Sequence, residues 1–293
     1  MMQENLSKIK MKEEQRTQDS TKDIFIPKTP KDFKEDDAFN YLQNIEIEIN
    51  NGIFSKKELL LLENALYGKF LDKSRRSFFL YHHLPLWVDS IRTLFKYNAH
   101  PKIIELGCGT GTSSLLFAML GAQSIGIELD ANLIGICNKR KRFYERQLEN
   151  LNVEFYQANT FDFHFEDHAP VDAYFSHFAF NLMKPADTLI ALLTSSLRVG
   201  GKIVIIDGNQ SNIYAHLIPS RRRPGVFTPS MMRKEFNRLG YRVVELKTHC
   251  AIPPIAFNSM LTRKFSLMAE EIIRFLGLQR FFSVSYTIVA EKS

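Results

Sequence analysis

A glycine-rich segment in the middle of the chain has the residue types that bring a backbone against a ligand. It reads Glu105-Leu-Gly-Cys-Gly-Thr-Gly111 and directly continues the apolar run Ile103–Leu106. Glycine has no Cβ, so alternating glycines let the chain turn sharply and approach a ligand closely. A helix that begins at Thr112 would point its first amides and its positive dipole end into the same space. The segment predicts a site for a nucleotide-like ligand, with a tight turn that binds nothing as the alternative.

The spacing of the glycines and a downstream carboxylate narrow the choice of ligand. Thr112 stands where a dinucleotide-binding G-x-G-x-x-G loop has its third glycine, and the chain has no G-x-x-x-x-G-K-[ST] loop for a triphosphate. Glu128 closes the next apolar run, about twenty residues after the loop, where a carboxylate can accept both hydroxyls of a ribose. These features disfavour a nicotinamide dehydrogenase and predict a ribose-binding role for Glu128.

Short apolar runs alternate with helical segments from Lys102 onward, and these elements must position the loop. The expected strands are Ile103–Leu106, Ser124–Leu129, Val153–Gln157, Val171–Ser176, Lys202–Asp207, Tyr241–Lys247 and Phe282–Ala290. The expected helices are Thr112–Leu120, Asn132–Leu148, Ala186–Leu197, Pro229–Leu239 and Met260–Phe275. Alternation of this kind requires crossover connections, which predict a mostly parallel sheet covered by helices on both faces.

The first hundred residues have a different character from the rest of the chain. Residues 1–22 contain so few apolar groups that we expect a disordered arm. Residues 23–100 predict a helical appendage or lid, with a capping box at Ser55–Glu58 and an aromatic segment that Pro85 must kink or interrupt. Residues 101–293 are expected to form the ligand-binding domain.

The loop and the strand ends together resemble the class I S-adenosylmethionine-dependent methyltransferases. The segment Glu105–Gly111 is similar to the first motif of that family, and Gly126-Ile-Glu128 is similar to its ribose-binding strand end. The resemblance extends over residues 100–292, with Asn159 where the family often has Asp and Val199 in place of the usual proline. It implies an α/β, Rossmann-like fold: a seven-stranded, mostly parallel sheet with an antiparallel last strand.

The same resemblance implies a cofactor and a set of residues that bind it. The cofactor is S-adenosyl-L-methionine, a methyl donor, and Glu105 would lie beneath the loop, where it organises the amides or meets the sulfonium through water. The implied cofactor-binding residues are Glu105, Gly107, Cys108, Gly109, Gly111, Glu128, Leu129, Asn159, Thr160 and Ser176.

The methyl acceptor is expected above the carboxyl end of the fourth strand, at His177. An imidazole titrates near neutrality, so His177 is the candidate general base, and a structural role is the alternative. Arg221, Arg222 and Arg223 follow the fifth strand and could clamp an acceptor carboxylate or phosphate, or they could be solvated. Tyr81 belongs to an aromatic stretch that either lines an acceptor cavity or forms the core of the appendage.

Charge and cysteine content suggest further expectations about partners and location. The chain carries 38 Lys and Arg against 32 Asp and Glu, a net charge of +6 that weakly favours an anionic partner. The basic run Lys139–Arg142 is expected to be an exposed helix face, with contact to nucleic acid or a membrane as the alternative. Three widely spaced cysteines fit a reducing cytoplasm, and no cluster has metal-ligand spacing, so no metal is predicted. No apolar run is long enough to span a membrane.

The resemblance therefore implies methyl transfer, and we expect a small-molecule acceptor that is methylated on oxygen, nitrogen or carbon. An RNA or protein methyltransferase is the first alternative, favoured only by the net charge and the basic runs. A binding module for S-adenosylmethionine without transfer activity is the second. Nucleic acid is thus an allowed partner, though not the favoured one.

Overall fold

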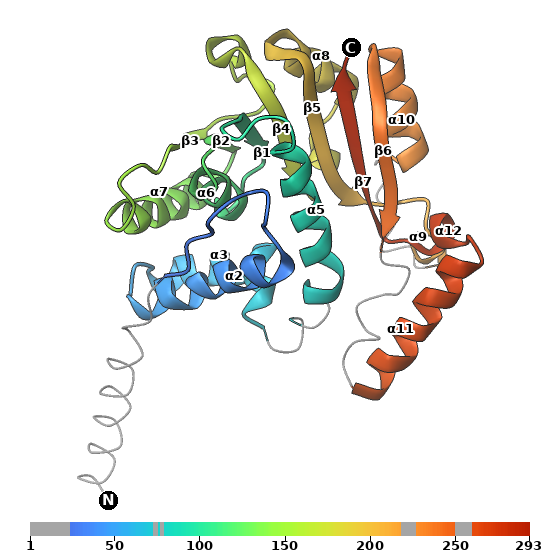
Figure 1. Ribbon diagram of the computed structural model, residues 1–293, viewed down its shortest axis with the longest axis horizontal. Coiled ribbons are helices and arrows are strands. Elements are labelled where there is room, and N and C mark those ends of the chain that lie inside the picture. Colours follow the sequence, from blue (N-terminus) through green and yellow to red (C-terminus); the bar gives the residue numbers. More distant parts are fainter. Residues whose placement is uncertain (1–23, 73–75, 77–78, 218–226, 250–259) are drawn as a thin grey trace, which may run out of the picture.

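A seven-stranded sheet forms the centre of the computed structural model, which describes residues 24–72, 76, 79–217, 227–249 and 260–293 (Figure 1). The strand order is β3-β2-β1-β4-β5-β7-β6. The strands are β1 Lys102–Leu106, β2 Gln123–Glu128, β3 Val153–Gln157, β4 Val171–His177, β5 Leu197–Gly208, β6 Tyr241–His249 and β7 Ser285–Lys292. Strands β1 to β5 pair in parallel, whereas β7 runs antiparallel to both β5 and β6. The expected fold class is confirmed.

The last strand begins later than the sequence predicted. The expected start was Phe282, but Gln279–Phe282 forms the short helix α12, and β7 begins at Ser285. The apolar side chains before Ser285 therefore belong to a helical turn. The aromatic and apolar composition of this stretch does not distinguish the two structures.

Five helices that follow the strands lie where the periodicity predicted them. They are α6 Thr112–Met119, α7 Ala131–Glu145, α8 Ala186–Ser196, α10 Pro229–Arg238 and α11 Met260–Phe275. The short helix α9 Ile213–Leu217 was not predicted. The hydroxyl of Thr228 caps α10 by accepting the amide of Met231, and Pro229 occupies its first turn. Single-turn helices η3 Phe165–His168 and η4 Phe180–Leu182 fill two of the connections.

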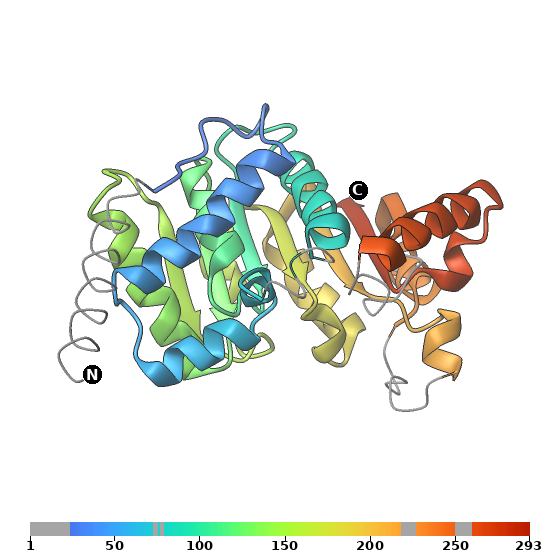
Figure 2. The same cartoon turned by 90° about the horizontal axis from the view of Figure 1, so that it is seen from below.

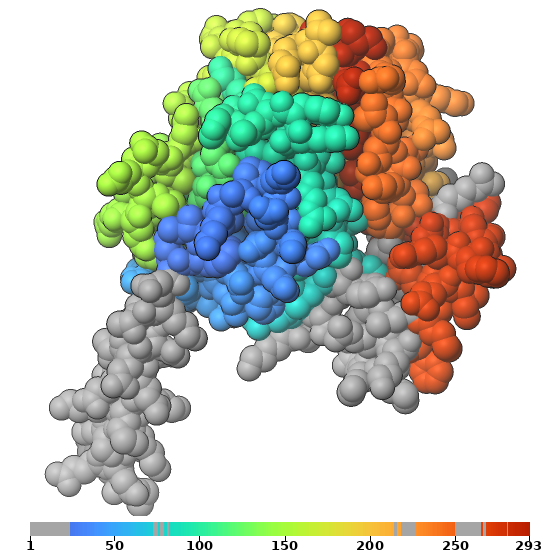
Figure 3. Space-filling model, viewed as in Figure 1, coloured from blue at the N-terminus to red at the C-terminus, as the bar shows by residue number. Residues whose placement is uncertain are grey.

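The amino-terminal region is helical and shares its core with the sheet. Its elements are α2 Glu35–Asn50, α3 Lys56–Asn64, η1 Tyr67–Phe70, η2 Phe79–His83 and α5 Leu84–Leu94. Tyr41 and Trp87 from these helices pack in one cluster with Phe117 of α6 and Phe175 of β4. Figure 2 shows α2 and α5 lying across one face of the sheet. In the space-filling view the blue and teal atoms of the amino-terminal helices adjoin the green atoms of the residues that follow them in the chain (Figure 3). The division into an appendage at residues 23–100 and a ligand-binding domain at residues 101–293 stays a prediction.

Pro85 marks the start of a helix. It lies in the first turn of α5, where its missing N–H takes no hydrogen bond from the helix, and the π-helical turn η2 precedes it. The predicted interruption is therefore a change of helix type just before the proline. None of the described helices is long and apolar enough to cross a membrane.

Candidate active site

The glycine loop connects β1 to α6 with three residues in the left-handed region. Gly107, Gly109 and Gly111 have φ angles of 69°, 56° and 75°. Residues with a Cβ adopt such backbone angles only under strain. A Cβ on Gly107 would lie 2.5 Å from the Cβ of Ala179, whereas a Cβ on Gly109 would meet nothing within 4 Å. The loop is packed against protein at its first glycine and open at its second.

Glu128 connects the end of β2 to this loop. Its Oε2 accepts the amide of Gly109 at 3.0 Å, and its Oε1 accepts the amides of Leu129 at 2.8 Å and Asp130 at 3.1 Å. The carboxylate is half-buried, and Leu129 beside it is 69% exposed. Two carboxylate oxygens offer about four acceptor positions, so with three amides bound Glu128 can hold the loop and still accept about one hydroxyl group of a ligand, at Oε2.

Glu105 lies in β1 just before the loop and is almost completely buried. The hydroxyl of Ser114 donates to its Oε2 at 2.5 Å. Burial raises the pKa of Glu105 to about 8, against the opposing hydrogen bonds of Ser114 and Ser113. Cys108 in the loop is also buried, and burial raises the pKa of its thiol well above the ordinary value. Both groups are therefore mainly protonated at neutral pH in the absence of a ligand.

The other residues assigned to the cofactor have different surroundings. Asn159 follows β3 and is exposed, and its Oδ1 accepts the amide of Phe161 at 3.1 Å. Thr160 is buried beside it. Ser176 is fully buried in β4, and its hydroxyl donates to the carbonyl of Leu106 at 3.2 Å. The loop, Glu128 and Asn159 thus lie at one edge of the sheet, while the hydroxyl of Ser176 is engaged within it.

His177 ends β4 and takes part in a buried polar chain. Its Nδ1 lies 2.8 Å from the hydroxyl of Tyr67, which lies 2.7 Å from the hydroxyl of Ser113. The indole of Trp87 donates to Ser113 at 3.1 Å. The Nε2 atom of His177 is buried and has no hydrogen-bond partner among the described residues. Burial, and then the neighbouring His83, hold the pKa of His177 well below its ordinary value, so the ring is neutral at neutral pH.

A strained turn and two rings surround this imidazole. Phe178 has φ 59°, a conformation that a bulky residue adopts only when its surroundings impose it. Its ring stacks on His177 with a centroid separation of 5.2 Å. The ring of His83, from the aromatic stretch singled out in the sequence, lies 5.2 Å from Phe178 and 6.3 Å from His177. The side chain of Tyr81 lies outside the described residues.

Other sequence predictions also fall outside the part of the chain that the structure describes. These are the arm at residues 1–22, the residues Arg221, Arg222 and Arg223, and Cys250. Conversely, Tyr67 and Ser113 were not predicted as site residues. Tyr67 lies in a four-residue helix and is 110 residues from His177 in the chain, so no local pattern relates the two.

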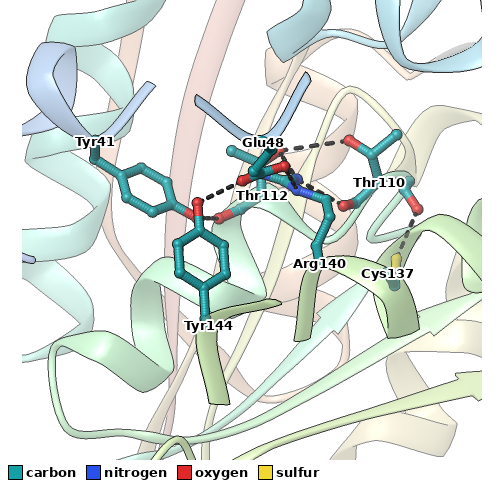
Figure 4. A network of polar contacts seen from close by, with 8 residues as sticks. Tyr41, Glu48, Thr110, Thr112, Cys137, Arg140 and Tyr144 are labelled. Atoms are coloured by element: carbon teal, nitrogen blue, oxygen red, sulfur yellow. Dashed lines mark hydrogen bonds and ion pairs between the residues drawn. The ribbon is translucent and has the colours of Figure 1, made fainter. Parts of the chain in front are cut away.

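The prediction that Lys139–Arg142 forms an exposed basic face is wrong for Arg140. Its side chain is fully buried and pairs with Glu48 of α2 (Figure 4). Arg140 lies three and four residues after Cys137 and Ile136, so it shares their buried face of α7. That helical spacing was the signal that could have placed it in the interior.

Two other cations of the run are also paired. Lys139 lies 2.7 Å from Glu58 of α3, and Lys141 lies 3.6 Å from Glu145 on its own helix. Three of the four cations of this run therefore face carboxylates of the protein itself.

Comparisons with known proteins agree with this fold. Residues 103–201 match a family model described as a methyltransferase domain. An uncharacterized methyltransferase of Staphylococcus carnosus (strain TM300) is 30% identical over 112 residues, which are 38% of this chain and 48% of that protein. The chain thus spans about half the length of that curated relative.

Solved structures share the architecture at low sequence identity. The MccD protein has a TM-score of 0.54 at 18% identity, with 72% of this chain and 98% of that chain covered. The YjhP protein of E. coli has a TM-score of 0.51 at 17% identity, covering 71% and 92%. The [4+2]-cyclase SpnF has a TM-score of 0.50 at 16% identity, covering 70% and 78%. At these identities the likeness concerns the fold alone.

Proposed function

We propose that this chain, whose residues 103–201 match a methyltransferase-domain model, is a class I S-adenosylmethionine-dependent methyltransferase that methylates a small-molecule acceptor. The observation that carries the proposal is the pairing of two features on adjacent parallel strands. The glycine loop follows β1, and β4 beside it ends in a buried imidazole whose Nε2 has no hydrogen-bond partner within the described part of the chain. A donor site and an acceptor site at the same edge of a sheet are what methyl transfer requires.

The residues around the loop fit S-adenosyl-L-methionine. When bound, this cofactor supplies an electrophilic methyl group on a sulfonium. The open side of Gly109 leaves room for a ligand against the backbone, and Oε2 of Glu128 keeps one acceptor position for a ribose hydroxyl. Leu129 and Asn159 are exposed at the neighbouring strand ends and are proposed to contact the adenine. The carboxyl of Glu105 is proposed to interact electrostatically with the positive sulfonium.

The hydrogen-bond chain supports a base role for Nε2 of His177. Trp87 can only donate, so Ser113 accepts its N–H and has one proton to give. If Ser113 gives that proton to Glu105, Tyr67 must donate to Ser113, and Nδ1 of His177 must donate to Tyr67. In this arrangement Nε2 carries the free electron pair.

The low pKa of His177 is compatible with that role. A neutral acceptor oxygen or nitrogen becomes cationic when it gains a methyl group, and its proton is then strongly acidic. A weak base can take that proton once the new bond forms. His177 would remove the proton at Nε2, while the rings of His83 and Phe178 keep water from the reacting atoms.

Burial and charge favour a small acceptor over RNA or protein. His177 is only 7% exposed and is enclosed by aromatic side chains, so a reacting group must enter the molecule. The basic run on α7, which favoured nucleic acid in the sequence, is largely neutralised by carboxylates of the protein itself. Tyr81 and Arg221–Arg223 remain proposed contacts for a polar group of the acceptor. Cytoplasmic location stays a prediction.

The proposal is tested by binding and by transfer. Calorimetry should show that the chain binds S-adenosylmethionine and not NAD, and Glu128→Ala should raise the Kd, since a lost ribose hydrogen bond to a charged carboxylate costs about 1–3 kcal/mol. Labelled cofactor incubated with fractionated metabolite extract should give a labelled small molecule, and total RNA or total protein should stay unlabelled. Binding of NAD instead of S-adenosylmethionine would contradict the proposal.

Two other outcomes would select the alternatives. Label in RNA or protein would favour a macromolecular acceptor. Tight cofactor binding with no transfer to any fraction would favour a module that binds S-adenosylmethionine without methylating. His177→Asn separates catalysis from binding, because it should lower turnover and leave the cofactor Kd unchanged.

A further inference from the structure

A fully buried ion pair joins helix α2 to helix α7 close to the glycine loop. The side chains of Glu48 and Arg140 have no exposed surface. Arg140 donates from Nε to Oε2 of Glu48 at 2.7 Å and from Nη2 to Oε1 at 3.0 Å. Two parallel hydrogen bonds of this kind fix the plane of the guanidinium group. The orientation of Arg140 is therefore set by a residue of the amino-terminal helix.

The remaining nitrogen of the guanidinium group reaches the loop. Nη1 of Arg140 donates to the carbonyl of Thr110 and to the hydroxyl of Thr112, both at 2.8 Å. Tyr41 of α2 donates to the carbonyl of Thr112 at 2.8 Å. Thr110 and Thr112 flank Gly111, the last glycine of the loop. Side chains from α2 and α7 thus hold the point where the loop becomes helix α6 (Figure 4).

Tyr144 completes the surroundings of Glu48. Its hydroxyl donates to the Glu48 carboxylate, and burial together with that carboxylate raises the pKa of Tyr144 well above its ordinary value. The phenol therefore remains a donor at all ordinary pH values. With two bonds from Arg140 and one from Tyr144, the carboxylate is fixed in place. We call Glu48, Arg140, Tyr144 and Tyr41 the Glu48–Arg140 clamp.

A further contact from α7 orients the middle of the loop. The thiol of Cys137 donates to the carbonyl of Gly109 at 3.2 Å. In a planar trans peptide the carbonyl and the following N–H point in opposite directions. The Gly109 carbonyl is held toward α7, so the amide of Thr110 is turned to the opposite side of the loop. Contacts on the α7 side therefore decide which way the donor groups of the loop face.

We propose that Glu48 is a positioning residue for the cofactor. It fixes Arg140, and Arg140 fixes the loop carbonyl at Thr110 in the conformation that accepts S-adenosylmethionine. This inference rests on the proposed function. It assigns the amino-terminal helix α2 a role in cofactor affinity, in addition to any contact with the acceptor.

A pair of variants separates positioning from folding. Glu48→Gln leaves a buried guanidinium without its counter-charge, which should lower both Tm and cofactor affinity. The double variant Glu48→Leu/Arg140→Met removes both charges, and apolar replacements of a buried ion pair commonly restore stability. Its Tm should therefore recover, while its Kd for S-adenosylmethionine stays about tenfold or more above wild type, a coupling typical between linked sites. Recovery of both Tm and Kd would overturn the proposal.

If the double variant does not fold, Arg140→Lys provides the same test. Lysine keeps a positive charge beside Glu48, but its single ammonium cannot form the parallel pair and also reach Thr110. We expect a folded protein with a raised Kd, and a wild-type Kd would contradict the clamp.

A second measurement needs no cofactor at all. In a Cys250→Ser background the two remaining thiols are Cys108 in the loop and Cys137 against it. Both are buried, so they react only when the loop opens. Alkylation of each, followed by mass spectrometry, reports how often the loop opens. The rates should rise about tenfold or more in the double variant if the clamp holds the loop. Unchanged rates would overturn the proposal, whether or not the wild-type chain binds S-adenosylmethionine.

The ion pair of Lys139 with Glu58 provides a matched control. It also joins an amino-terminal helix to α7, at 2.7 Å, and among the described residues this contact does not involve the loop. Glu58→Gln should therefore change neither the cofactor Kd nor the thiol rates. An effect as large as that of Glu48→Gln would show that the loop responds to any loss of contact between these helices, and would refute a specific role for Glu48.

Discussion

The phenol oxygen of Tyr67 lies 2.8 Å from Nδ1 of His177. This contact joins a four-residue helix of the amino-terminal region to the end of β4. Through Ser113, which lies 2.7 Å from the same oxygen, it continues to the first turn of α6 beneath the cofactor loop. The proposed acceptor side and the cofactor side of the site are thus connected by buried hydrogen bonds.

Tyr67→Phe should lower turnover without weakening cofactor binding. The phenylalanine keeps the ring packed against Trp87 and Phe79, but Nδ1 of His177 loses the group that fixes its tautomer. We expect kcat to fall by about tenfold or more, which is within the range that a positioned base supplies. Leaving buried polar groups unpartnered should also lower the stability by about 1–3 kcal/mol. Steady-state kinetics, calorimetry and thermal unfolding measure the three quantities.

Tyr174→Phe is the matched control for this variant. Tyr174 lies on β4, the strand that ends in His177. Its buried hydroxyl bonds to Ser196 in the core on the opposite face of the sheet. The same atom is lost there, so stability should fall by a similar amount with an unchanged kcat. A kcat that falls equally in both variants would show that turnover follows stability and not the Tyr67–His177 contact.

Glu105 should make recognition of the sulfonium depend on pH. Burial raises its pKa to about 8, so its carboxyl gains negative charge as the pH rises from 7 to 9. A nearby positive charge favours the ionised form. The affinity for S-adenosylmethionine should therefore increase over this range relative to the affinity for its neutral thioether product. Calorimetry with both ligands at pH 7, 8 and 9 measures the ratio, which should become constant in Glu105→Gln.

The same carboxyl predicts how the stability of the ligand-free protein varies with pH. Between about pH 4.5 and 8 the folded chain keeps a proton that the unfolded chain has lost. Because the unfolded chain binds fewer protons, the free energy of unfolding falls as the pH rises through this window. Glu105→Gln should reduce that decline in denaturant titrations at pH 5 to 8.5. An identical pH profile in wild type and variant would exclude a raised pKa at Glu105.

The elements of the sheet could be predicted from the sequence because their signals are local. Apolar runs bounded by polar residues predicted every strand of the sheet, and β3 has the predicted bounds. The start of α10 followed from Thr228 and Pro229. The error at Phe282 has the same origin, since an aromatic run fits a helical turn and a strand equally well.

Only part of the candidate site could be predicted in this way. The loop and Glu128 were recognisable because a short motif contains them. Tyr67 and the Glu48–Arg140 pair were not, because their partners lie 92 to 110 residues away in the chain. Such long-range polar contacts depend on how the helices pack on the sheet, and composition favours a surface location for an arginine. For Arg140 the sequence did contain a local indication, since it follows the buried residues Ile136 and Cys137 at helical spacing on α7.

The three glycines Gly107, Gly109 and Gly200 separate backbone strain from ligand contact. All have positive φ, so alanine at each should lower stability by about 1–2 kcal/mol from strain. At Gly107 the new Cβ would also lie 2.5 Å from Ala179, so Gly107→Ala should unfold at the lowest temperature. At Gly109 and Gly200 a Cβ meets nothing within 4 Å, and these two variants should unfold at similar temperatures.

Cofactor binding should distinguish the last two variants. The open side of Gly109 is where we propose that S-adenosylmethionine lies, so a methyl group there should raise the Kd by about tenfold or more, since one misplaced heavy atom costs about 1–3 kcal/mol in a packed contact. Gly200 lies near the start of β5, away from the loop, so Gly200→Ala should bind like wild type. Calorimetry and thermal unfolding on the three purified variants measure both properties. Equal affinities for Gly109→Ala and Gly200→Ala would mean that the ligand does not approach Gly109, and the proposed cofactor site would have to lie elsewhere on this edge of the sheet.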